Sequence, residues 1–191
     1  MTNSILTIYK YIFTILIFNN FFTQSINFTF NNYCNHVINL YSHENNKYVN
    51  LCNIKKNKSY SKSYNNKHSG VFKHTLSPNA TLFEYSIVNS GIYYDISIIS
   101  TNTYYYNKKT NFNKIIDYQK NTGFNIPMHV KVKAPKFHNS KTCDNLFCNK
   151  NNCTDAYLYP DDDLKTHFCD KGTIFNINFC NKKMKYIKNK F

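Results

Sequence analysis

The chain has 191 residues, enough for one domain with a sizeable core, and its formal net charge of +14 comes from lysine alone, because arginine is absent. Nucleic-acid recognition favours arginine for its bidentate contacts, so this charge argues against a nucleic-acid partner. A solvated lysine face and attraction to an anionic surface polymer both remain open as interpretations of the charge.

The first 25 residues resemble a secretory signal peptide. An apolar run covers residues 11–18, and a plausible cleavage site follows Ser25. An uncleaved signal anchor is the alternative, but Lys10, Asn19 and Asn20 keep the run short of the ~20 residues that a membrane span needs. We therefore expect a secreted, extracellular protein with no membrane span after cleavage.

From residue 26 onward the hydrophobic pattern has a period of two, which is typical of half-buried strands. The segments INFTFN, TLFEYSIV, YYDISII, MHVKVKA and TIFNINFC all alternate apolar with polar residues, and no segment shows a helical stripe. The pattern predicts an all-β fold, an antiparallel β-sandwich with one polar face. The residues expected in its core are Phe28, Phe30, Ile96, Ile98, Val130, Val132, Phe175, Ile177 and Phe179.

Two stretches interrupt this pattern. Residues 55–69 are polar and of low complexity, and residues 101–122 separate two strands by more than an ordinary hairpin loop does. After Cys180, residues 181–191 form a lysine-rich tail, for which a frayed terminus is the default. The predicted domain therefore runs from residue 26 to residue 180, with an insertion at 101–122.

Two acidic residues lie on neighbouring predicted strands joined by the turn NSGI. If Val88 pairs with Tyr93, Glu84 and Asp95 are diagonal neighbours on one face, roughly 7–8 Å apart. A register slip of one residue would send one of them to the other face. Their apolar and aromatic neighbours favour a shared cleft over a solvated edge.

Seven cysteines in a secreted chain indicate disulfides, with one cysteine left over. A zinc site is the alternative, but the spacing matches no compact Cys-x2-Cys pattern, and we expect neither metal nor cofactor. The zinc site would use His138, Cys143, Cys148, Cys153, His167 and Cys169. Four glycosylation sequons occur, at Asn27, Asn57, Asn79 and Asn152, of which Asn57 and Asn79 are the better candidates because Asn27 lies on a predicted strand.

Several of these segments, in order along the chain, resemble the thaumatin-like (osmotin-like) family. They are FTFNNYCNHVINLYS, TLFEYSI, YYDISII, GFNIPM and CTDAYLYPDDDLKTHFC followed by FNINFC, and together they span residues 28–180. The resemblance implies a disulfide-stabilised β-sandwich with an acidic cleft lined by one arginine and four acids. By this resemblance the chain is similar to a pared-down member of the family, because NKNN stands where family members carry a disulfide-rich second domain.

The resemblance also implies roles for individual residues. Glu84, Asp95 and Asp162 fall on cleft acids, with Asp163 beside them; Thr122 replaces an acid, and no arginine stands near residues 70–71. The implied disulfides are Cys34–Cys180, Cys143–Cys169 and Cys148–Cys153, which leave Cys52 unpaired.

The function that the resemblance favours is binding of a cell-wall or host β-glucan by a secreted, monomeric protein through a degenerate acidic cleft. The candidate ligand-binding residues are Glu84, Asp95, Asp162 and Asp163, with Tyr104, Tyr105 and Tyr106 of the insertion as stacking surfaces. The alternative is a surface or host-interaction protein that binds anionic partners through its basic face. Catalysis is not favoured: a weak endo-β-1,3-glucanase is the one enzymatic candidate, with Glu84, Asp95 and Asp162 as its acids. Without a second domain, we expect these carboxylates to face water.

Overall fold

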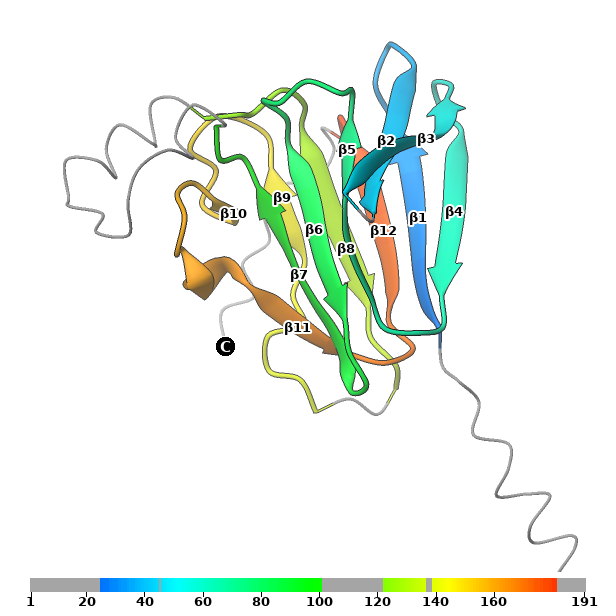
Figure 1. Cartoon of the computed structure of the whole chain (residues 1–191), viewed down its shortest axis with the longest axis vertical. Coiled ribbons are helices and arrows are strands. Elements are labelled where there is room, and N and C mark those ends of the chain that lie inside the picture. The colour runs from blue at the N-terminus through cyan, green and yellow to red at the C-terminus, as the bar shows by residue number, and fades with distance from the viewer. Residues whose placement is uncertain (1–24, 45, 101–121, 137–138, 182–191) are drawn as a thin grey trace, which may run out of the picture.

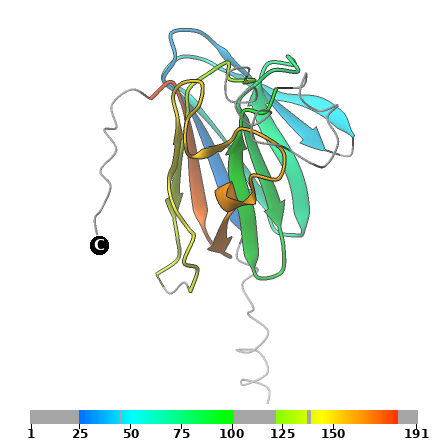
Figure 2. The same ribbon diagram turned by 90° about the vertical axis from the view of Figure 1, so that its left-hand side faces the viewer.

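The computed structural model describes residues 25–44, 46–100, 122–136 and 139–181. Over these ranges the chain forms two β-sheets that pack face to face (Figures 1 and 2). One three-residue 3-10 helix, η2 (Asp163–Lys165), is the single helical element of the described ranges. The all-β sandwich predicted from the alternating pattern is therefore confirmed.

The five-stranded sheet has the strand order β4-β1-β12-β8-β9. β1 and β12 pair in parallel, whereas the other neighbours in this sheet are antiparallel. Its strands are β1 (Ile26–Asn32), β4 (Ser59–Tyr64), β8 (Met128–Lys133), β9 (Leu146–Cys148) and β12 (Ile174–Phe179).

The second sheet has the order β10-β7-β6-β5-β2-β3, and β11 also pairs with β7. All of its pairings are antiparallel except that of β10 with β7. Its strands are β2 (Ile38–Glu44), β3 (Lys47–Ile54), β5 (His68–His74), β6 (Leu82–Ile87), β7 (Gly91–Ser97), β10 (Ala156–Tyr157) and β11 (His167–Asp170).

Aromatic side chains fill the space between the sheets. The Phe28 ring lies 5.0–5.7 Å from four other aromatic rings, two on β6 and one each on β5 and β12: Phe83, Tyr85, Phe72 and Phe175. Contacts of this kind contribute beyond the area that they bury. Of the nine residues predicted for the core, eight are fully buried, and Val132 packs against them partly buried.

Three disulfides connect the strands and loops. Cys34 bonds to Cys180, Cys143 to Cys169 and Cys148 to Cys153, which are the three pairs that the resemblance implies. Four cysteines of the zinc alternative are thus bonded to one another. Cys52, on β3, is the one free cysteine of the described residues.

One expectation about regular structure is wrong. Residues 55–69, which interrupt the sequence pattern, hold β4 and the start of β5. On β4 the inward positions are Tyr60, Lys62 and Tyr64. The strand therefore alternates, but a lysine occupies an inward position at which an apolar residue is usual. The stacking tyrosines 104–106, most of the insertion and nearly all of the tail lie outside the described residues.

Lys62 and Tyr64 contact a carboxylate at the edge of the sandwich. Glu44 accepts hydrogen bonds from Lys62 Nζ at 3.0 Å and from Tyr64 Oη at 2.6 Å. His68 Nε2 lies 3.5 Å from the same carboxylate, and the His68 ring stacks on Tyr64 at 4.2 Å. Burial acts to raise the pKa of Glu44, but these donors outweigh it and lower the pKa overall.

No helix in the described part of the chain has the length and apolarity of a membrane span. Within the same residues, no group of three or more His, Cys, Asp or Glu side chains is arranged to hold a metal ion.

Candidate functional site

Glu84 and Asp95 lie directly opposite each other on β6 and β7. The predicted pairing of Val88 with Tyr93 is wrong by two positions, because residues 88–91 form the turn, closed by a hydrogen bond from Val88 N to Gly91 O, and Ile87 pairs with Ile92. A two-residue shift keeps side chains on the same face. The acids therefore share one face as expected, but as a directly opposed pair with Cβ atoms about 4.5–5.5 Å apart rather than as diagonal neighbours.

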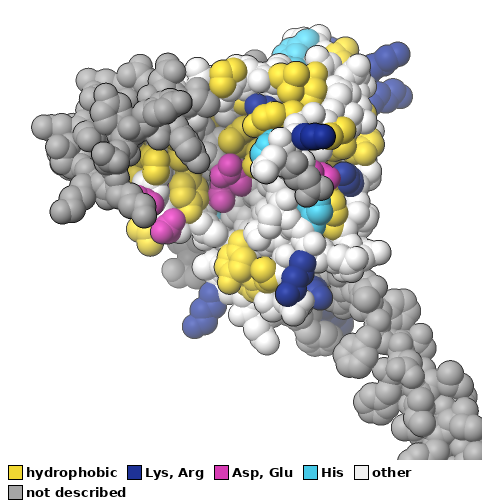
Figure 3. Space-filling view, viewed as in Figure 1, with side chains coloured by type: hydrophobic (Ala, Val, Ile, Leu, Met, Phe, Trp, Pro, Cys, Tyr) yellow, Lys and Arg dark blue, Asp and Glu magenta, His cyan; other side chains and the backbone are white. Residues whose placement is uncertain are grey.

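The pair lies in a pocket of about 440 Å³ on the outer face of the second sheet. Figure 3 views this face and shows acidic side chains in a hollow near its middle, with hydrophobic side chains around it. Strands β2, β5, β6 and β7 supply the lining except Asn46, which lies between β2 and β3, and outward side chains alternate with buried ones along these strands. The lining residues are His43, Asn46, Ser69, Gly70, Val71, Glu84, Tyr85, Ser86, Tyr93 and Asp95.

Both carboxyl groups are partly buried, and this changes their protonation. Burial raises the pKa of Asp95 to about 8, and the negative charge and hydrogen bond of Glu84 act in the same direction. Burial also raises the pKa of Glu84, while the hydrogen bond from Asp95 partly offsets the effect. The Asp95 carboxyl is therefore largely protonated at neutral pH and can donate its proton to Glu84. The expectation that these carboxylates face water in the absence of a second domain is met only in part: they line a surface pocket, yet burial raises the pKa of both.

Of the expected cleft acids, the structure brings together only these two in the pocket. Asp162 is buried at the N-terminus of η2, and exposed Asp163 accepts a hydrogen bond from Tyr157 Oη at 3.3 Å. Tyr157 follows the β10 residue that pairs with Ile96, and its pKa is raised by burial and, more weakly, by the charge of Asp95. Neither Asp162 nor Asp163 lines the pocket, and only Asp163 is hydrogen-bonded to Tyr157.

The position where the resemblance places an arginine is part of the pocket wall. Val71 pairs with Glu84 across β5 and β6, and Gly70 lies beside it. A Cβ atom on Gly70 would lie 3.0 Å from both His43 O and Tyr85 Oη, so the backbone of β5 approaches its neighbours closely here. The pocket therefore has a short wall where a long cationic side chain is expected.

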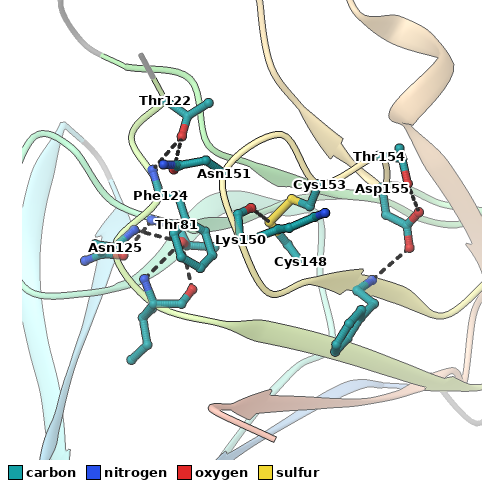
Figure 4. Close-up of a disulfide and its surroundings, with 12 residues drawn as sticks. Thr81, Thr122, Phe124, Asn125, Cys148, Lys150, Asn151, Cys153, Thr154 and Asp155 are labelled. Atoms are coloured by element: carbon teal, nitrogen blue, oxygen red, sulfur yellow. Dashed lines mark hydrogen bonds between the residues drawn. A yellow bond between two sulfur atoms is a disulfide. The ribbon is translucent and has the colours of Figure 1, made fainter. Parts of the chain in front are cut away.

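Thr122 is hydrogen-bonded to the shortest of the three disulfide loops (Figure 4). Its hydroxyl donates to Asn151 Oδ1 at 2.6 Å, within the loop closed by Cys148 and Cys153. Asn125 Oδ1 then accepts a hydrogen bond from Thr81 N at 2.8 Å, just before β6. These bonds fix the segment that enters β8 against the start of the strand that carries Glu84.

Sequence reasoning missed five pocket residues whose polar side chains lie on or beside this face: His43, Asn46, Ser69, Ser86 and Tyr93. Ser69 and Ser86 face each other with their hydroxyl oxygens 2.8 Å apart. Tyr93 is 47% exposed, and its ring lies 4.8 Å from that of Phe168 on β11. The alternation of β6 and β7 places Ser86 and Tyr93 on the face of the acids, so this signal could have identified them; His43 and Ser69 depend on long-range pairing.

The geometry of the acid pair suits the binding of a ligand by hydrogen bonds and charge better than it suits catalysis by two carboxyl groups. Glycoside hydrolysis needs carboxyl groups about 5 Å or more apart, so that a sugar carbon or a water fits between them. Glu84 and Asp95 are hydrogen-bonded to each other. Such a pair can accept hydrogen bonds from ligand hydroxyls or ammonium groups while the tyrosine at the rim offers an apolar face.

Comparison with solved structures agrees with the resemblance at the level of the fold. A thaumatin-like xylanase inhibitor superposes with a TM-score of 0.52 at 14% identity, covering 80% of this chain and 98% of that one. The protein elicitor MoHrip2 from Magnaporthe oryzae gives a TM-score of 0.47 at 12% identity over 81% of this chain and 98% of that one. No protein-family model matches the chain, and no curated protein does. Together with the two sheets and three disulfides, the first of these likenesses defines the fold as thaumatin-like.

Proposed function

We propose that this protein acts outside the cell and binds a carbohydrate in the pocket around Glu84 and Asp95. Three disulfides support an oxidising compartment. The observation that carries the proposal is a carboxyl pair beside an exposed tyrosine in one pocket. Aromatic faces pack on sugar rings, and carboxylates and serine hydroxyls bond to sugar hydroxyls.

The sugar ring packs on Tyr93, which Phe168 supports from β11. Its hydroxyl groups reach Glu84, Asp95 and the Ser69–Ser86 pair on the neighbouring strands. A β-glucan is the candidate class of ligand. Asp162 and Asp163 lie outside the pocket lining. They would contact the ligand only if it is long enough to extend beyond the pocket.

Substitution of the tyrosine tests the proposal. Tyr93→Ala should weaken binding of a soluble β-1,3-glucan oligomer at least about tenfold, because the stacking surface is lost. The matched control is Tyr33→Ala, which removes an equally exposed tyrosine (48%) outside the pocket. Isothermal titration calorimetry gives both affinities; equal affinities for the two variants and the parent would contradict the proposal.

The second candidate is electrostatic binding of an anionic polymer, which the net charge of +14 favours. The two candidates respond differently to salt, because exposed charges are screened within about 8 Å at physiological ionic strength. A pull-down on insoluble β-1,3-glucan and on an anionic matrix, at low and high salt, separates them. Salt-resistant capture by glucan supports the pocket, and salt-labile capture by the anionic matrix alone supports the basic surface.

A further inference from the structure

The acid pair has no cationic partner among the described residues. The ion pairs of this part of the chain join Lys62 and His68 to Glu44, and His167 to Asp144. Lys73 lies on the same outward face of β5, two residues beyond Val71, but its Nζ donates to Ser77 O at 2.9 Å and lies 4.1 Å from the Tyr48 ring centroid. This lysine is therefore engaged by Ser77 and Tyr48, neither of which lines the pocket.

The pair also has unused capacity to accept hydrogen bonds. Asp95 Oδ1 is buried and accepts no hydrogen bond from any N–H or O–H group of the described residues. Two opposed carboxyl groups in a partly buried site are stable only when a proton or a cation separates their charges. In the free protein a shared proton separates the two charges. A ligand with its own positive charge would take the place of that proton.

We propose that the pocket prefers sugars that carry a free amino group, such as β-linked glucosamine oligomers, over their N-acetylated or neutral counterparts. The inference rests on the proposed function, since it uses the same pocket. The ammonium group binds between Glu84 and Asp95, the sugar ring packs on Tyr93, and the neighbouring hydroxyls face Ser69 and Ser86. An ammonium supplies several donors to a carboxylate pair at charge-assisted strength, which an acetamide or hydroxyl does not.

The lining favours an amino sugar over a lysine side chain of a peptide. A lysine brings one ammonium on an aliphatic stem, which leaves the paired serine hydroxyls without a ligand partner. An amino sugar places hydroxyls next to its ammonium and presents a flat face to Tyr93, which is 47% exposed. The positive net charge opposes a polycation at long range, but it is screened in physiological salt, whereas contacts in a partly buried site are screened much less.

Calorimetric titrations with three oligomers of equal length test the inference: a glucosamine tetramer, its fully N-acetylated form and a β-1,3-glucan tetramer. At pH 6.5 and 0.15 M salt, the parent protein should bind the glucosamine tetramer at least about tenfold more tightly than the other two. Glu84→Gln and Asp95→Asn should each reduce that affinity about tenfold or more and change the affinity for the neutral oligomer much less. Thermal unfolding curves establish whether each variant is folded. Because the two substitutions lie on different strands, one folded variant is enough to test the inference.

Asp161→Asn is the matched control, because it removes one exposed carboxylate outside the pocket lining, at a backbone φ of 68° that asparagine also adopts. It should leave all three affinities unchanged. Equal binding of the glucosamine and N-acetylated tetramers, or an equal loss in Asp161→Asn, would overturn the inference. If the neutral glucan binds in a Tyr93-dependent way without any preference for the amine, this inference fails and the proposed function stands. Tighter binding of a lysine tetrapeptide than of the glucosamine tetramer would overturn it in favour of a peptide ligand.

Discussion

Glu44 and Glu84 show how two residues of one type acquire opposite properties from their contacts. Lys62, Tyr64 and His68 surround Glu44, and although burial opposes them, these donors lower its pKa. Glu84 faces Asp95 without a cation, and burial raises its pKa. The charge of Glu44 therefore stabilises the folded state at neutral pH, whereas a second charge on the Glu84–Asp95 pair destabilises it.

Asp95→Asn should make the protein less sensitive to rising pH. In the folded state the pKa of Asp95 is raised from its ordinary value of 3.8 to about 8, so between these values the folded state binds more protons than the unfolded state. The free energy of unfolding therefore falls as pH rises from about 4 to 8, and the stabilisation from this proton is lost above about 8. Without that carboxyl, the variant should gain about 3–4 kcal/mol relative to the parent between pH 5 and pH 8, at about 1.4 kcal/mol per pH unit.

Urea unfolding of parent and variant at pH 5, 6, 7 and 8 measures this difference. Asp161→Asn serves again as the control and should follow the parent at every pH. A constant difference between Asp95→Asn and the parent across this range would show that Asp95 does not carry the shared proton.

At the scale of the elements, the approach of β11 to β7 depends on one glycine. Gly91 opens β7 and pairs with Asp170, and a Cβ atom placed there would lie 2.0 Å from Cys169 O. Because that atom belongs to the backbone beside a disulfide, it cannot move as the end of a flexible side chain can. β11 in turn carries Phe168, which supports Tyr93 at the pocket rim.

Gly91→Ala should therefore destabilise the protein by about 1–3 kcal/mol or more through overpacking. Ser90→Ala, an exposed position in the same turn, should cost less than about 0.5 kcal/mol. Thermal or urea unfolding compares the two. Equal stabilities would mean that β11 can shift away from β7 without loss of packing.

How far the sequence predicts these elements depends on whether their signal is local. β1, β6, β7, β8 and β12 alternate apolar with polar residues and are predicted, together with eight fully buried core positions. β4 is missed because Lys62 occupies an inward position, where it contacts Glu44 of the other sheet. The parallel pairing of β1 with β12 joins segments at opposite ends of the described chain, and no local pattern encodes it.

The candidate site is predictable to a similar extent. Alternation places Glu84 and Asp95 on one face, but the turn sets their register, and that turn uses Val88–Gly91 instead of starting one residue later. Burial of the pair, and the contributions of His43 and Ser69, depend on β2 and β5 lying beside β6, which is a tertiary property.

At the scale of the whole molecule, we expect Cys34–Cys180 to stabilise the fold more than either of the other two disulfides does. It spans a sequence separation of 146 residues, compared with 5 for Cys148–Cys153. In the chain-entropy model, a bond that closes a longer loop removes more freedom from the unfolded chain.

Replacing Cys34 and Cys180 together by serine should lower the free energy of unfolding by about 2–5 kcal/mol. The double serine variant at Cys148 and Cys153 should cost less, because the loop that it opens is short. Urea unfolding under non-reducing conditions ranks the two variants. A greater loss from opening the short loop would show that native packing around Cys148 and Cys153 matters more than chain entropy.

The position of β12 also governs when the protein can fold during its synthesis. The ribosome produces β12 after every other described strand, yet it lies in the middle of its sheet, between β1 and β8. Until residues 174–179 emerge, Phe28 and Phe30 have no neighbour on that side, and the apolar faces of both flanking strands stay open. Folding of this sheet consequently cannot be completed before residues 174–179 have emerged, and the nascent chain must be kept from aggregating until β12 inserts between β1 and β8.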